Sequence, residues 1–143
     1  MDPIARTSVT VPGTTEGIRR AAEAFETFIS GRDVPQPARR RCLVALDETL
    51  SNVVRHGQPA PGESIVVTFS LFPDHLELEL ADTAAPFDLL QQPAPDRAAG
   101  VAARPLGGLG IALVRGTMTS VRYERRDGRN VLTLTASLTD PSS

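Results

Sequence analysis

The hydrophobic positions first alternate briefly and then follow a helical spacing. Valines alternate with polar residues over 7–11, which predicts a strand, possibly at a sheet edge. Proline and glycine end it, and Thr14 or Thr15 can cap a helix whose apolar residues recur every three or four positions. A second helical pattern begins at Pro37 and continues to about His56. The first part of the chain therefore predicts one strand and two helices.

The second part of the chain returns to an alternating pattern. Residues 65–71 and 76–80 alternate, which predicts a hairpin with one buried and one wet face. Residues 83–106 have no periodicity and several prolines, as expected of a functional loop or lid. A short helix is predicted over 111–114, and the Asp127-Gly128 turn predicts a closing hairpin.

This order of elements predicts the fold class. A strand, two helices, two strands, a loop, a short helix and two strands favour an α+β protein. We expect a two-layer sandwich with a mostly antiparallel sheet and helices packed on one face. The length of 143 residues fits one domain, and the 41% of apolar residues can supply its core.

Composition narrows the class of protein. The net charge of −2 gives no sign of direct nucleic-acid binding. No apolar run approaches the roughly 20 residues of a membrane span, and the start has no signal-peptide pattern. Cys42 is the single cysteine, so it cannot form an internal disulfide, and we expect it to be buried. Together these features predict a cytoplasmic protein without a membrane partner.

The end of the second helical pattern contains candidate chemistry. Glu48, Asn52 and His56 are four residues apart and share one stripe of the helix. An amide oxygen can bind a magnesium ion, and a carboxylate one turn away can accept a proton from an attacking hydroxyl. Polar residues at this spacing also occur on solvated faces, so this segment alone leaves both interpretations open.

Two later segments offer complementary chemistry. Asp82 ends an apolar strand, where it could accept a hydrogen bond from an adenine amino group or cap a turn. Gly107, Gly108 and Gly110 precede a helix and could admit a phosphate to its backbone amides, with Arg104 adding charge. The same glycines could instead form a flexible connector.

The three segments, in this order, resemble the GHKL ATPase superfamily. Segments 46–57, 107–110 and 121–130 are similar to those of the anti-sigma-factor serine kinases of the RsbW and SpoIIAB type. This resemblance implies the GHKL (Bergerat) fold and one ATP-binding kinase domain over residues 1–143. It implies ATP and Mg²⁺ as cofactors.

The resemblance also implies a role for each candidate residue. Segment 89–106 would be the lid over the nucleotide. The other roles are the general base toward a serine hydroxyl at Glu48, the magnesium ligand at Asn52, the adenine acceptor at Asp82, and the phosphate site at Arg104, Gly107, Gly108 and Gly110.

The implied function is an anti-sigma factor with ATP-dependent protein serine kinase activity. In this family the kinase phosphorylates a STAS-type anti-anti-sigma factor, which releases the sigma factor when unphosphorylated, and relatives are homodimers. One departure keeps an alternative open, because Ala84 replaces the first glycine of the family's Asp-x-Gly box. Positive φ would strain alanine there and weaken nucleotide binding. The alternative is a nucleotide-binding or degenerate module that sequesters a partner without turnover.

Overall fold

The computed structural model describes residues 2–56, 64–83, 114 and 116–139. Its elements occur in the predicted order. They are β1 (Ala5–Pro12), α1 (Thr15–Ile29), α2 (Gln36–His56), β2 (Ser64–Leu71), β3 (His75–Asp82), β4 (Ser120–Arg126) and β5 (Arg129–Ser137). Residues 114, 116 and 117 are helical, while the remainder of the predicted short helix and residues 84–106 of the predicted lid lie outside the described residues.

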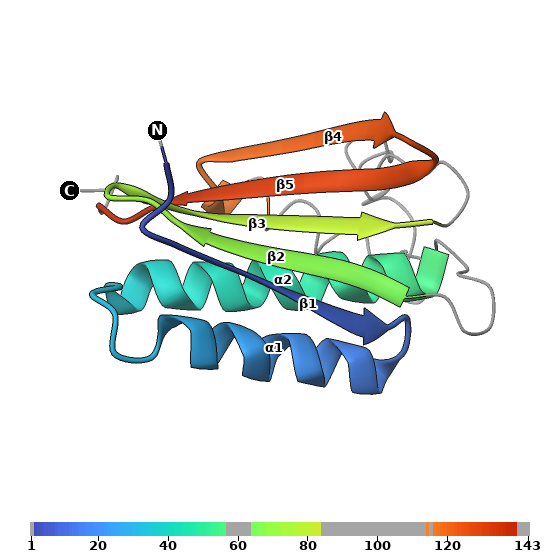
Figure 1. Cartoon of the computed structure of the whole chain (residues 1–143), viewed down its shortest axis with the longest axis horizontal. Helices are drawn as coiled ribbons and strands as arrows, with labels where there is room; N and C mark the ends of the chain where they lie inside the picture. Colours follow the sequence, from blue (N-terminus) through green and yellow to red (C-terminus); the bar gives the residue numbers. More distant parts are fainter. Residues whose placement is uncertain (1, 57–63, 84–113, 115, 140–143) are drawn as a thin grey trace, which may run out of the picture.

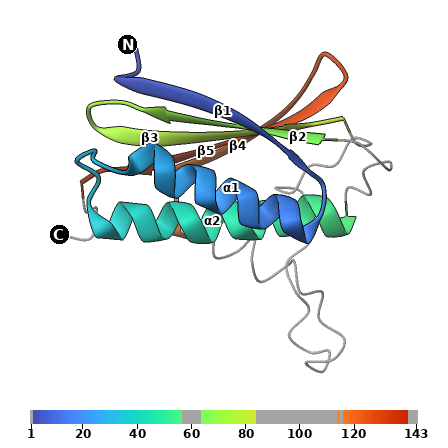
Figure 2. The same ribbon diagram turned by 60° about the horizontal axis from the view of Figure 1, so that its bottom comes forward.

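The strands form one antiparallel sheet. Their order is β1-β2-β3-β5-β4, so β1 is an edge strand as predicted and β4 forms the other edge. Helices α1 and α2 both lie on the same face of this sheet (Figures 1 and 2). The predicted α+β fold, a two-layer sandwich with helices on one face, is confirmed.

Local signals in the sequence account for two of the element boundaries. Thr14 has extended backbone angles, and its side-chain oxygen accepts a hydrogen bond from the Gly17 N–H at 3.2 Å, which caps α1. At the closing hairpin, Asp127 and Gly128 both have positive φ, 53° and 75°. Two successive residues of that kind match the twist of the strands that they join.

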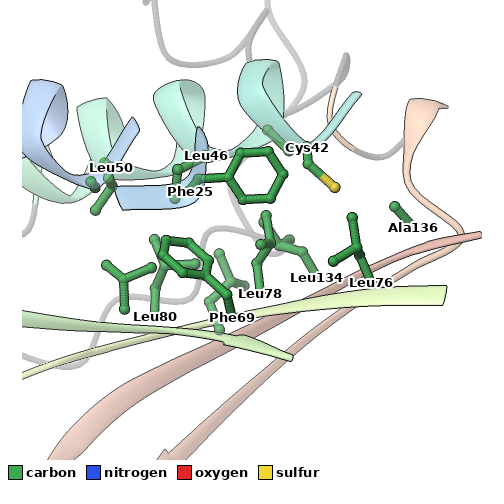
Figure 3. Close-up of a cluster of buried hydrophobic side chains, with 14 of the residues drawn as sticks. Phe25, Cys42, Leu46, Leu50, Phe69, Leu76, Leu78, Leu80, Leu134 and Ala136 are labelled. Atoms are coloured by element: carbon green, nitrogen blue, oxygen red, sulfur yellow. The ribbon is translucent and has the colours of Figure 1, made fainter. Parts of the chain in front are cut away.

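The core lies between the helices and the sheet (Figure 3). The Phe25 ring of α1 meets the Phe69 ring of β2 edge to face, with 5.5 Å between ring centroids. Leucines of β3 and β5 pack beneath the helices. Cys42 is buried as predicted, and burial raises the pKa of its thiol to about 12. A thiol of that pKa stays protonated at neutral pH, so Cys42 acts as a core residue rather than a nucleophile.

The expected wet face of the first hairpin is wrong for β2. Thr68 and Ser70 lie on the face opposite the helices, yet they are only 7% and 6% exposed. Since β2 lies between two other strands, longer neighbours such as Glu77 and Glu79 of β3 stand beside these short side chains. A hydrogen bond of 2.8 Å between the Ser8 and Thr68 hydroxyls ties β1 to β2 on this face.

A close approach of β1 and α1 gives a stability prediction at Gly17. A Cβ at this position would lie 1.8 Å from the Pro12 carbonyl oxygen, far inside van der Waals contact. Alanine normally stabilises a helix by about 1 kcal/mol relative to glycine. We expect Gly17→Ala instead to lower the free energy of unfolding by about 1–3 kcal/mol, because β1 and α1 must separate.

Urea denaturation followed by circular dichroism measures this change. Gly116→Ala is the matched control, because a Cβ there meets no atom of the described residues within 4 Å. An increase in stability for Gly17→Ala would contradict the predicted clash.

Candidate functional site

Three chain segments that carry the candidate residues meet at one end of the molecule. The C-terminal end of α2, the C-terminal end of β3 and the start of β5 lie on the same side in two views (Figures 1 and 2). This follows from topology, since β5 runs antiparallel to β3 and Asn130 faces Asp82 across the two strands. The structure therefore brings the candidate residues of α2 and β3 to one end of the sandwich.

The buried side chain of Asn52 includes an acceptor that is unsatisfied among the described residues. Its side chain is 1% exposed, and its Nδ2 donates a hydrogen bond of 2.8 Å to the main-chain oxygen of Glu48. This contact settles the orientation of the amide, because a carbonyl only accepts. The buried Oδ1 atom has no hydrogen-bond partner within the part of the chain that the structure describes.

An acceptor of this kind calls for a ligand. Leaving a buried polar group unsatisfied costs about 1–3 kcal/mol, and such groups are rare in folded proteins. The neighbouring Thr49 shows the usual solution, because its buried hydroxyl donates to the main-chain oxygen of Ala45 at 2.7 Å. A hard cation such as Mg²⁺ prefers oxygen ligands and keeps most of its shell for water and phosphate oxygens. The amide oxygen of Asn52 therefore fits a magnesium site.

Glu48 lies one helical turn before Asn52 and is half-buried. Its main chain positions the Asn52 amide, while its own carboxylate is on the same stripe of α2. A carboxylate can accept a proton from a hydroxyl bound beside the cation site. The structure places Glu48 and Asn52 one turn apart on α2, and their roles in a site stay predictions. His56 ends α2, as the sequence predicted.

Asp82 ends β3 on the helix-facing side of the sheet and is 5% exposed. Its Oδ1 accepts a hydrogen bond of 3.0 Å from Nδ2 of Asn130. A carboxylate held in this way can accept a further hydrogen bond from an amino group.

Asn130 is a site residue for which sequence reasoning assigned no role. Its amide is 6% exposed, and its Oδ1 accepts hydrogen bonds from the Tyr123 hydroxyl at 2.6 Å and the Arg125 guanidinium at 3.2 Å. No local sequence pattern predicts this hydrogen-bond network, because its residues come together only through the pairing of β3, β5 and β4.

The remaining predicted site residues are not placed. Arg104, Gly107, Gly108 and Gly110 lie outside the described residues, as does Ala84. Their assignment to phosphate binding, and the effect of alanine in the Asp-x-Gly box, stay predictions from sequence.

A separate hollow of about 220 Å³ lies on the opposite face of the sheet. Arg126, one of the charged residues that line it, pairs with Glu124 at 2.7 Å and with Glu79 at 3.7 Å. Exposed ion pairs of this kind contribute little to stability. Neither Asn52 nor Asp82 lines the hollow, so it is separate from the candidate site.

Within the described ranges, no helix is both long and apolar enough to cross a membrane.

Comparison with known proteins identifies the class. A family model described as the histidine kinase-like ATPase domain matches residues 11–136. The chain belongs to this family, which implies that its site binds ATP. The matched span runs from the end of β1 to β5 and so includes every candidate residue.

Individual relatives are named as protein kinases. The chain is 36% identical over 102 residues to the serine/threonine-protein kinase BtrW of Bordetella bronchiseptica, covering 69% of this chain and 72% of that protein. It is 30% identical over 93 residues to the serine-protein kinase RsbW of Bacillus cereus, covering 62% of this chain and 58% of RsbW.

A solved structure has the same fold. It contains the RsbU and RsbW domains of a Mycobacterium tuberculosis protein and is similar over 97% of this chain, with a TM-score of 0.69 and 17% identity. The present chain spans 34% of that longer one. Its RsbW domain agrees with the fold expected from the sequence.

Proposed function

We propose that this protein is an ATP-dependent protein serine kinase that acts as an anti-sigma factor. The observation that carries the proposal is the buried Asn52 Oδ1 without a partner among the described residues, one turn from the Glu48 carboxylate. In a histidine kinase-like ATPase domain with relatives named serine kinases, that pair is suited to a magnesium nucleotide and a hydroxyl substrate.

Each candidate residue binds a different part of the magnesium nucleotide. Asn52 holds Mg²⁺ through its amide oxygen, and Asp82 accepts a hydrogen bond from the adenine amino group. Gly107, Gly108 and Gly110 hold the phosphates with main-chain amides, and Arg104 contributes positive charge. When bound, the magnesium ion neutralises charge on the phosphates during transfer.

Glu48 acts on the second substrate. The serine oxygen attacks the γ-phosphorus, the bond from that phosphorus to the β–γ bridging oxygen breaks, and ADP leaves. The serine proton passes to the Glu48 carboxylate, which serves as general base. Its side chain is half-buried on α2, one helical turn before Asn52.

The partners follow from the family resemblance. The phosphorylated serine belongs to a STAS-type anti-anti-sigma factor, and the second partner is a sigma factor. The kinase acts in the cytoplasm as a homodimer, without contacting nucleic acid directly. The alternative, a module that binds its partner without turnover, is favoured only by Ala84 in the Asp-x-Gly box.

Phosphoryl transfer to purified STAS-domain proteins tests this proposal. With γ-labelled ATP and Mg²⁺, we expect label on one serine of a cognate protein and none on its Ser→Ala variant. Calorimetry with ATP and Mg²⁺ provides the parallel binding measurement. ATP binding and partner capture without transfer to any STAS protein of the organism would support the non-catalytic module. Absence of ATP binding would contradict the kinase function and leave only the degenerate module.

A further inference from the structure

The hydrogen bonds around Asn130 have a defined direction. Asn130 lies on β5 between Arg125 of β4 and Asp82 of β3, directly opposite both in strand register. A guanidinium only donates and an ionised carboxylate only accepts. The amide satisfies both, because its oxygen accepts from Arg125 at 3.2 Å and its Nδ2 donates to Asp82 at 3.0 Å.

Tyr123 strengthens this arrangement. Its hydroxyl donates to the same Asn130 oxygen at 2.6 Å, so two donors hold one end of the amide. With its oxygen held in this way, the amide cannot flip without placing an acceptor against the Asp82 carboxylate. Asn130 is 6% exposed and Asp82 is 5% exposed, so water does not readily replace these contacts.

The amide also separates two groups that would otherwise attract each other. A guanidinium can bind both oxygens of a carboxylate at once. The Asn130 amide stands between Arg125 and Asp82 and gives the carboxylate a directed hydrogen bond on Oδ1. Holding that oxygen sets the plane in which Asp82 can accept a hydrogen bond from a ligand.

We propose that Asn130 is a positioning residue that orients Asp82 toward the 6-amino group of adenine and thereby sets the base preference of the site. This inference rests on the proposed function, in which Asp82 receives the base. A 6-amino group donates to a carboxylate, whereas the 6-oxo group of hypoxanthine or guanine presents a second acceptor. A carboxylate held in one orientation rejects bases without the donor more strongly than a mobile one.

The test compares nucleotides that differ at one group. Calorimetry measures binding of ATP, purine riboside triphosphate (which lacks the 6-amino group) and ITP, each with Mg²⁺. We expect the wild-type protein to prefer ATP over purine riboside triphosphate by about tenfold or more, the usual worth of a hydrogen bond to a charged group. In Asn130→Ala that preference should fall to about threefold or less, because Asp82 is no longer oriented. Asn130→Ser, which keeps a donor, should recover part of it.

A matched control separates orientation from folding. Thr133→Ala removes another side chain of β5 that is 8% exposed but lies on the opposite face of the sheet. We expect it to leave the ratio of the two affinities unchanged. Thermal melting reports folding of each variant. If Asn130→Ala does not fold, Tyr123→Phe replaces it, because this change removes one donor to the Asn130 oxygen. The same ratio of affinities for ATP and purine riboside triphosphate is measured, and we expect a smaller decrease.

Two results would overturn the inference in different ways. Asn130 would only support the fold if Asn130→Ala weakened the binding of ATP and of purine riboside triphosphate equally. Where Tyr123→Phe replaces that variant, an unchanged ratio of the two affinities would show the same. In that case wild-type ATP binding, and the proposed function, would stand. A wild-type protein that binds no ATP would remove the proposed function and this inference with it.

Discussion

Glu48→Gln is expected to slow phosphoryl transfer by about 10²–10⁴-fold, the usual contribution of a general base. Glutamine keeps the shape of the side chain and some hydrogen bonding, but it cannot take the serine proton at neutral pH. Thermal stability and ATP affinity should change little, because the contact between Glu48 and Asn52 uses the Glu48 main chain. Single-turnover phosphorylation of a STAS-domain substrate, beside an ATP titration of the same variant, measures both effects.

The adjacent carboxylate provides the control for this variant. Asp47 is exposed, and Asp47→Asn makes the same charge change one residue away on α2. We expect it to transfer phosphate at the wild-type rate. Transfer at the wild-type rate by Glu48→Gln would refute the general-base assignment. Loss of ATP binding together with transfer would mean that Glu48 supports the site rather than the reaction.

Asn52→Ala is expected to weaken ATP binding in the presence of Mg²⁺ by about tenfold or more, at least the loss seen when residues supporting a metal site are removed. Binding without Mg²⁺ should fall much less, because the amide oxygen acts through the ion. The ligand-free protein should lose little stability. The substitution removes one hydrogen bond, but it also removes a buried acceptor whose isolation costs about 1–3 kcal/mol.

ATP titrations with Mg²⁺ and with EDTA, beside thermal melting of the ligand-free protein, measure these effects. Ser51→Ala, a polar-to-alanine change at the preceding and half-buried position of α2, is the control and should bind like the wild type. Equal losses with and without Mg²⁺ would exclude Asn52 as a metal ligand. A large loss of stability in the ligand-free protein would assign Asn52 a structural role instead.

Much of the fold could be predicted because its signals are local. A helix cap depends on backbone within three residues, so Thr14 could be recognised as a candidate cap of α1. A two-residue hairpin turn depends on positive φ at successive positions, so Asp127-Gly128 could be recognised as well. Alternation and helical spacing similarly identified the strands and helices that form the core.

The candidate site was predictable only in part. Glu48 and Asn52 could be paired because a helix brings residues four apart together whatever surrounds it. Asp82 could be proposed from its place at a strand end. The contact between Asp82 and Asn130 could not be predicted, because it joins residues 48 positions apart through strand pairing. A period of two tells which face a residue takes and not which strand lies beside it.

The sequence by itself determined the order of elements, their apolar faces and the pairing of Glu48 with Asn52, since each depends on backbone geometry within a few residues. Only the tertiary structure decided which polar groups are buried and with what partners. It left the Asn52 oxygen unsatisfied among the described residues and brought Gly17 against the Pro12 carbonyl. Such outcomes depend on how α1, α2 and the sheet pack together, and packing is the sum of contacts between residues far apart in the chain.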